Sequence, residues 1–176
     1  MGMAKATMAK SKYPSGFSTT ITIPSGNQND VSDAQLVQSD LAKIGINVTI
    51  KTLDPAALVT AENGGNFDMV FGLYTTDIVD PDEIARFVGT YTGGVQTLYT
   101  GFKDRQMDEL ALTASSAPDQ GTRKIAYDKM QQIIAETVPF IPMFNVPGVY
   151  SYSKKVHDFH PGATGNYFLE KVWLPK

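Results

Sequence analysis

The first half of the chain alternates between two hydrophobic periods. Residues 18–24 place Ile21 and Ile23 on one side and hydroxyl side chains on the other, and this period of two predicts a half-buried strand. Apolar residues then recur at helical spacing from Ala34 to Ile44. The sequence therefore predicts a strand followed by a helix.

Polar and glycine residues mark the two ends of this helix. Ser32 and Gln35 are spaced as in a capping box, and Gly45 occupies the place of a left-handed C-terminal cap. Residues 46–51 alternate again between apolar and polar side chains, which predicts a second strand. Strand, helix and strand within about 35 residues are typical of a βαβ unit with parallel strands.

The same pattern then continues into a third strand. Asp54 and Pro55 predict the start of a short helix, with Asp as the N-cap, and the pair Gly64–Gly65 predicts its end. Residues 69–74 are apolar on both faces, as expected of a central parallel strand. The predicted fold class is therefore α/β, with an open βαβαβ sheet and flanking helices.

The second half of the chain is mainly helical in pattern. Asp80 and Asp104 are expected to cap helices, and a further helix is predicted from Thr122 to Thr137, where Pro139 follows. The remaining expected segments are a loop at 91–102 and two strands at 140–146 and 149–153, which Pro142 and Pro147 restrict to a sheet edge or kink.

Composition excludes several classes of protein. The 176 residues suit roughly one domain, and the net charge of −3, with no basic run longer than Lys154–Lys155, excludes a nucleic-acid-binding surface. Cysteine is absent, which excludes disulfides and thiolate sites, and no apolar run approaches the roughly 18 residues of a membrane helix. Residues 1–12 lack the apolar region of a signal peptide, so the chain as written is expected to be soluble and not exported unaided.

Two loops follow predicted strand ends, where open α/β sheets bind ligands. The loop Ser25–Asp30 lacks the spacing and the lysine of a phosphate-binding loop, and a polar turn explains it. The loop Thr75–Asp80 and the following turn carry four carboxylates, of which helix capping and the helix dipole explain all but Asp77. Asp77 could accept an ammonium group, although a solvated loop aspartate is the more common state, and the spacing of a calcium loop is missing.

Signals for catalysis are weak. His157 and His160 are too few ligands for a tetrahedral zinc site, and no Gly-x-Ser-x-Gly motif is present. The acidic residues leave a paired-carboxylate hydrolase open, but nothing in the sequence sets an acid against a base. We expect no enzymatic activity, no metal and no cofactor.

Several stretches resemble, in register, the C-terminal lobe of the family 5 extracellular solute-binding proteins, which serve ABC importers of oligopeptides, dipeptides and nickel. The similar stretches, which cover most of the chain, are residues 4–17 ending in Tyr-Pro-Ser-Gly-Phe, Leu41–Val48, Asn66–Gly72 with Asp77–Pro81, Tyr99–Asp104, Ala135–Pro142 and Glu170–Trp173.

The resemblance implies one lobe of a type II periplasmic-binding-protein fold. Its expected parts are an opening helix and connection at 1–17, a lobe core at 18–155 and a tail at 156–176 that would return to a missing N-terminal lobe and expose its aromatics. The implied function is capture of a peptide or similar solute between two lobes and delivery to an ABC permease. The full-length protein is then expected in the periplasm or outside the cell, and this chain alone is expected to bind peptide weakly or not at all.

The resemblance also implies the site. An aspartate at the position of Asp77 pairs with the ligand's α-ammonium group in peptide-binding members, and Tyr74 stands where the family usually has Trp. Nickel, haem, glutathione and sugar ligands occur on similar folds, so the solute stays open. The alternatives are a small α/β hydrolase-like enzyme with a carboxylate site and a stand-alone interaction domain. The other expected ligand contacts are Thr75, Thr76, Ser25, Asn27 and Tyr99.

Overall fold

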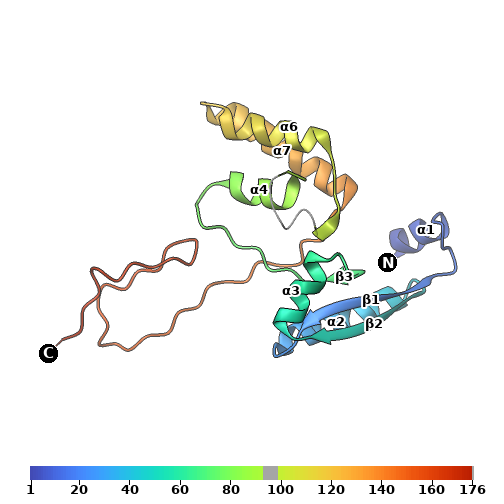
Figure 1. The fold of residues 1–176 in the computed structure, drawn as a ribbon, viewed down its shortest axis with the longest axis horizontal. Coiled ribbons are helices and arrows are strands. Elements are labelled where there is room, and N and C mark those ends of the chain that lie inside the picture. Colours follow the sequence, from blue (N-terminus) through green and yellow to red (C-terminus); the bar gives the residue numbers. More distant parts are fainter. Residues whose placement is uncertain (93–98, 176) are drawn as a thin grey trace. The chain divides into compact units, whose positions relative to one another are not determined.

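The structure, a computed structural model, describes residues 1–92 and 99–175 and divides the chain into two compact units, residues 1–73 and 74–176 (Figure 1). Each unit has its own hydrophobic core. No helix among the described residues has the length and apolar character needed to cross a membrane. The division into an opening segment, one lobe core and a tail stays a prediction.

Unit 1 contains a three-stranded parallel sheet in the order β2-β1-β3, which confirms the predicted βαβαβ pattern (Figure 1). Its core consists of Ile21, Ile23, Ala34, Ile46 and Val48. The elements of unit 1 are α1 (Gly2–Ala9), β1 (Phe17–Pro24), α2 (Gln28–Ala42), β2 (Ile46–Leu53), α3 (Pro55–Asn63) and β3 (Met69–Val70).

The central strand of this sheet is β1 and not the segment 69–74. Because β1 lies between two strands and is contacted by α2 and α3, Thr22 on its polar side is as fully buried as its neighbours. On that same side Ser18 is exposed and Thr20 is half-buried, so the predicted half-buried strand holds only for the first part of β1. The expected six-residue strand was wrong, since β3 pairs with β1 only at Met69 and Val70. Gly72 follows at once, and a glycine offers no side chain to pack in a strand.

Caps define the helices of unit 1. Asp54 caps α3 by accepting the N–H of Ala57 at 3.0 Å, as predicted. The capping box at Ser32 was wrong, because α2 begins one turn earlier with Asn27 as its N-cap. Asn is among the best N-cap residues, and the Ser32 hydroxyl instead donates to the carbonyl of Gln28.

Unit 2 is built on α4 (Pro81–Gly89), α6 (Arg105–Ser116) and α7 (Gln120–Thr137), which pack on one another. Gly89 lets α4 approach closely, because a Cβ there would lie 2.8 Å from the Met107 side chain. The helix capped by Asp104 and the helix before Pro139 confirm two predictions, while the expected loop at 91–102 lies partly outside the described residues. The core of unit 2 consists of Met107, Ala111, Ala114, Ala126, Tyr127 and Met130.

The segment after α7 contains no strand at 140–146 or 149–153, so both predictions were wrong. Three prolines in this segment lack the N–H that a β-ladder needs, and no described strand pairs with it. In the tail, isolated antiparallel bridges join His157 to Trp173 and Pro161 to Tyr167. The aromatic residues Tyr167, Phe168 and Trp173 are more than half exposed, as the resemblance implied. Phe159 differs, because it is half-buried against the rings of Tyr150, Tyr152 and Tyr167.

Candidate ligand-binding site

The candidate site is the loop 74–80 together with the first turn of α4. Asp80 is the N-cap of α4 and accepts the N–H of Asp82 at 2.9 Å, and Pro81 occupies the first helical turn, where a missing N–H leaves no bond unmade. The predicted helix start is therefore confirmed. Asp80 fixes the position at which the loop ends and the helix begins. The other three carboxylates, of Asp77, Asp82 and Glu83, lie within three residues of Asp80.

Asp80 also forms a long-range ion pair. Nη2 of Arg123, on α7, lies 2.6 Å from Oδ1 and 2.7 Å from Oδ2 of Asp80, and 3.3 Å from the hydroxyl of Tyr127. The N–H of Asp82 and the Arg123 guanidinium together lower the pKa of the Asp80 carboxyl below its ordinary value. Burial raises the pKa of the Tyr127 hydroxyl. This contact fastens the start of α4 to α7.

The next two carboxylates are engaged as well. Oδ2 of Asp82 lies 3.9 Å from the Arg86 guanidinium, while Oδ1 is buried and has no hydrogen-bond partner among the described residues. Oε2 of Glu83 accepts two consecutive backbone N–H groups, from Asp77 at 2.9 Å and from Ile78 at 3.1 Å. From the sequence, Glu83 was expected only to interact with the helix dipole, so these two hydrogen bonds were missed. The spacing Asp80-x-x-Glu83, typical of a side chain that reaches back toward the N-cap, could have indicated them.

Asp77 differs from these three residues. Its backbone is held, because its N–H donates to Glu83 and its carbonyl accepts from Nδ2 of Asn166 at 3.5 Å. Its carboxylate is exposed and makes no hydrogen bond or ion pair with any described residue. The arginine of this region pairs with Asp80. Asp77 thus combines a backbone held by hydrogen bonds with a carboxylate whose oxygens can still accept hydrogen bonds from a ligand.

The other predicted contacts fall into both units. In unit 1, Ser25 is exposed, and Asn27 uses its side-chain oxygen to cap α2 by accepting from Asn29 at 3.0 Å. In unit 2, the structure brings Tyr74, Thr75 and Thr76 together with Asp77 in one loop, in which Tyr74 is 38% exposed, and it describes Tyr99 as half-buried. The grouping of all seven residues at one ligand stays a prediction.

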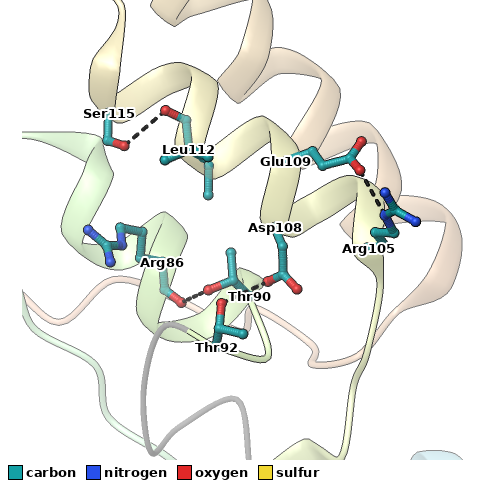
Figure 2. Close-up of a pocket in the computed structure, with 9 residues that line it drawn as sticks. Arg86, Thr90, Thr92, Arg105, Asp108, Glu109, Leu112 and Ser115 are labelled. Atoms are coloured by element: carbon teal, nitrogen blue, oxygen red, sulfur yellow. Dashed lines mark hydrogen bonds and ion pairs between the residues drawn. The ribbon is translucent and has the colours of Figure 1, made fainter.

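The described cavities lie elsewhere. A cavity of about 340 Å³ lies against α4 and α6, and its polar groups bond to one another, as Arg105 does to Glu109 at 2.8 Å and Thr92 to Asp108 at 3.3 Å (Figure 2). A second cavity of about 370 Å³ in unit 1 is lined by polar residues that include Asp68. Neither cavity is lined by a predicted contact residue.

Metal ligands are not gathered in the described ranges. Within residues 1–92 and 99–175, no three His, Cys, Asp or Glu side chains lie close enough together to hold an ion. The imidazole of His157 instead stacks on the indole of Trp173, with ring centroids 4.1 Å apart. The indole N–H donates to Asp158 at 2.8 Å. These contacts give the first histidine of the pair a structural role.

Comparison with known proteins identifies relatives among peptide-binding proteins. The chain is 32% identical over 148 residues to "Di/tripeptide-binding protein 1" of Pseudomonas aeruginosa, covering 82% of this chain and 27% of that protein. It is 28% identical over 165 residues to "Oligopeptide-binding protein AppA" of Bacillus subtilis, covering 91% of this chain and 30% of that protein. The chain thus spans under a third of the length of these relatives.

Solved structures share the fold. A dipeptide-binding protein from Pseudoalteromonas sp. SM9913 in complex with Met-Leu matches 99% of this chain and 35% of its own, with a TM-score of 0.80 and 24% identity. DppA of Helicobacter pylori, in complex with the peptide STSA, matches 98% of this chain and 34% of its own, with a TM-score of 0.75 and 29% identity. The predicted periplasmic-binding-protein fold is therefore confirmed.

The family itself is identified by a separate match. The sequence pattern of the family described as "Bacterial extracellular solute-binding proteins, family 5 Middle" matches residues 2–95, more than half of the chain. This is a family of solute-binding proteins and not of enzymes. The chain belongs to the family 5 bacterial extracellular solute-binding proteins.

Proposed function

We propose that this chain is part of the substrate-binding component of an ABC importer, which takes up a peptide between two lobes and delivers it to a membrane permease. Membership of the family and the peptide-binding relatives support the proposal. Because the chain spans about a quarter of the first relative, the missing N-terminal lobe of the same protein supplies the rest of the cleft. The complete protein works in the periplasm or outside the cell.

Asp77 is the anchor for the ligand's α-ammonium group. The observation that carries this assignment is that, of the four carboxylates at 77–83, only Asp77 has a side chain without a partner among the described residues. A desolvated ammonium–carboxylate bond is charge-assisted, and it orients a ligand whose side chains vary. Such an anchor favours a peptide with a free N-terminus.

The remaining predicted contacts give the cleft its wall and its polar rim. Tyr74 provides an aromatic surface beside the anchor, and the hydroxyls of Thr75 and Thr76 follow in the same loop. Asn27 offers its side-chain N–H groups, since capping of α2 uses only its oxygen. Ser25 and Tyr99 complete the set. The protein acts by binding and release, with no catalytic residue, and the hydrolase alternative is not favoured by the family.

Calorimetric titration of the two-lobe protein that carries this chain tests the proposal. The probes are the dipeptide Met-Leu and its N-acetylated form, which lacks the ammonium group but keeps both side chains. We expect saturable binding of Met-Leu and a loss of about 10–100-fold in affinity on acetylation, the value of a charged hydrogen bond. Equal affinities for the two probes would contradict the proposed ammonium-binding site. Failure to bind either probe would contradict the proposal that the ligand is a peptide.

A further inference from the structure

The carboxylate of Glu83 reaches past its own helix. Glu83 is the third residue of α4, where a glutamate ordinarily accepts the N–H of the N-cap residue. Here Oε2 accepts the N–H groups of Asp77 and Ile78, which precede the N-cap Asp80 by three and two residues. One oxygen therefore ties the preceding loop to the first turn of the helix.

This pair of hydrogen bonds fixes the backbone at the proposed anchor. Two consecutive N–H groups that point at one oxygen set the orientation of the two peptide planes on either side of the Asp77 Cα. Bonds from backbone N–H groups to a carboxylate are charge-assisted, so they are stronger than neutral ones. On the other side, Asn166 donates to the Asp77 carbonyl at 3.5 Å. The side chain of Asp77 therefore extends from a backbone that is held by hydrogen bonds at both its N–H and its C=O.

The helix that carries Glu83 is itself firmly placed. Asp80 pairs with Arg123 of α7, and Gly89 at the far end of α4 lies against Met107 and Met130 of the unit 2 core. Glu83 is half-buried. The Glu83 carboxylate therefore extends from a packed helix, so its hydrogen bonds can hold the backbone of an otherwise exposed loop in place.

We infer that Glu83 is a positioning residue for ligand recognition, which holds the Asp77 carboxylate in the direction that accepts the ligand's ammonium group. The inference rests on the proposed function. It assigns to Glu83 an effect on selectivity for free N-termini, exerted through the backbone of Asp77 and without contact with the ligand.

Charge and hydrogen bonding can be separated at this position. Glu83→Ala removes both the negative charge and the acceptor, whereas Glu83→Gln removes only the charge and keeps an oxygen that can accept from both N–H groups. Glu136→Ala is the matched control, because Glu136 is an exposed glutamate on α7 and its substitution removes the same charge. These three variants are compared with the unchanged two-lobe protein and with Asp77→Asn.

Two measurements are made on each protein. The first is the ratio of the affinities for Met-Leu and N-acetyl-Met-Leu, and the second is amide hydrogen exchange at Asp77 and Ile78. We expect Glu83→Ala to lower that ratio about tenfold and to speed exchange at both amides, while Glu83→Gln retains most of the ratio and of the protection. Glu136→Ala should change neither.

The outcomes distinguish this inference from the proposed function. If Asp77→Asn lowers the ratio but Glu83→Ala leaves it unchanged, the positioning role is overturned and the anchor stands. If Glu83→Gln is as poor as Glu83→Ala while its two amides stay protected, the effect is one of charge, and the positioning role is again overturned. If Asp77→Asn leaves the ratio unchanged, the anchor is wrong and the positioning role falls with it.

Discussion

Gly16 and Gly45 meet backbone to backbone at the start of the sheet in unit 1. A Cβ on Gly16 would overlap the carbonyl oxygen of Gly45, and both glycines have positive φ angles, of 91° and 88°. The residues that follow them, Phe17 and Ile46, are the first paired residues of β1 and β2. The close approach therefore sets the register of the parallel pair.

Gly16→Ala should destabilise the protein through this contact. Gly26 offers a matched control, because it has the same φ of 91° but no atom within 4 Å of the place that a Cβ would occupy. Both substitutions incur the cost of a positive φ, about 1–2 kcal/mol, and Gly16→Ala adds an overlap worth about 1–3 kcal/mol. Urea denaturation measures the difference in free energy of unfolding, and equal values for the two variants would contradict the close contact.

Asp77→Asn should weaken binding of a peptide with a free N-terminus. The amide keeps the shape of the side chain but loses its charge, so we expect about 10–100-fold lower affinity of the two-lobe protein for Met-Leu, measured by calorimetry. Binding of N-acetyl-Met-Leu should not change. Glu136→Gln, which makes the same change from carboxylate to amide at an exposed position on α7, serves as the control.

Asp68 should stabilise unit 1 through its side-chain oxygen. Oδ2 accepts the N–H of Thr20 at 2.9 Å and the hydroxyl of Thr19 at 3.2 Å, which fastens the residue before β3 to β1. Asp68→Ala leaves the backbone N–H of Thr20 without this acceptor, and we expect a loss of about 1–3 kcal/mol in the free energy of unfolding. Asp68→Asn keeps an acceptor oxygen and should lose less, so an equal loss in both variants would contradict this role.

Acid should weaken the attachment of α4 to α7. The pKa of Asp80 is lowered in the folded protein by the N–H of Asp82 and by Arg123, so its contribution to stability is present above its unfolded pKa of about 3.9. That contribution is lost as the pH falls through the lower folded pKa. Asp80→Asn should therefore flatten the decline of the thermal midpoint between about pH 5 and pH 2.

Asp119 provides an internal reference for this experiment. Its pKa is also lowered, mainly by the N–H of Thr122 at the start of α7, so its contribution has the same sign and is retained in Asp80→Asn. The variant should keep part of the acid dependence for that reason. An unchanged profile in Asp80→Asn would show that the pair with Arg123 does not act on stability.

Local patterns accounted for much of this fold. Asp54, Asp80 and Asp104 each cap the helix that follows, because an N-cap depends only on residues within one turn. Gly45 adopts the positive φ predicted for it. These features are short-range, and the sequence contains all the atoms that decide them.

Non-local pairing decided the features that sequence patterns missed. Residues 149–153 have the composition of a strand, but a strand exists only where a partner completes its ladder. The apolar segment at 69–74 was expected in the centre of the sheet, yet its place depends on which strand pairs with β1. In the site, Asp77 could be singled out from the sequence because helix capping and the helix dipole explain the three neighbouring carboxylates. The ion pair of Asp80 with Arg123 could not be predicted, because Arg123 lies 43 positions further along the chain and leaves no local sequence signal.

The bond from Glu83 to the amides of Asp77 and Ile78 confines a recognition element to seven consecutive residues. Such an element can change by substitution within one short stretch without redesign of a distant surface. A single insertion or deletion between positions 77 and 83 would break the hydrogen bonds between Glu83 and the backbone of Asp77. Related proteins that keep the same preference for free amino termini should therefore differ in this stretch in residue type but not in length.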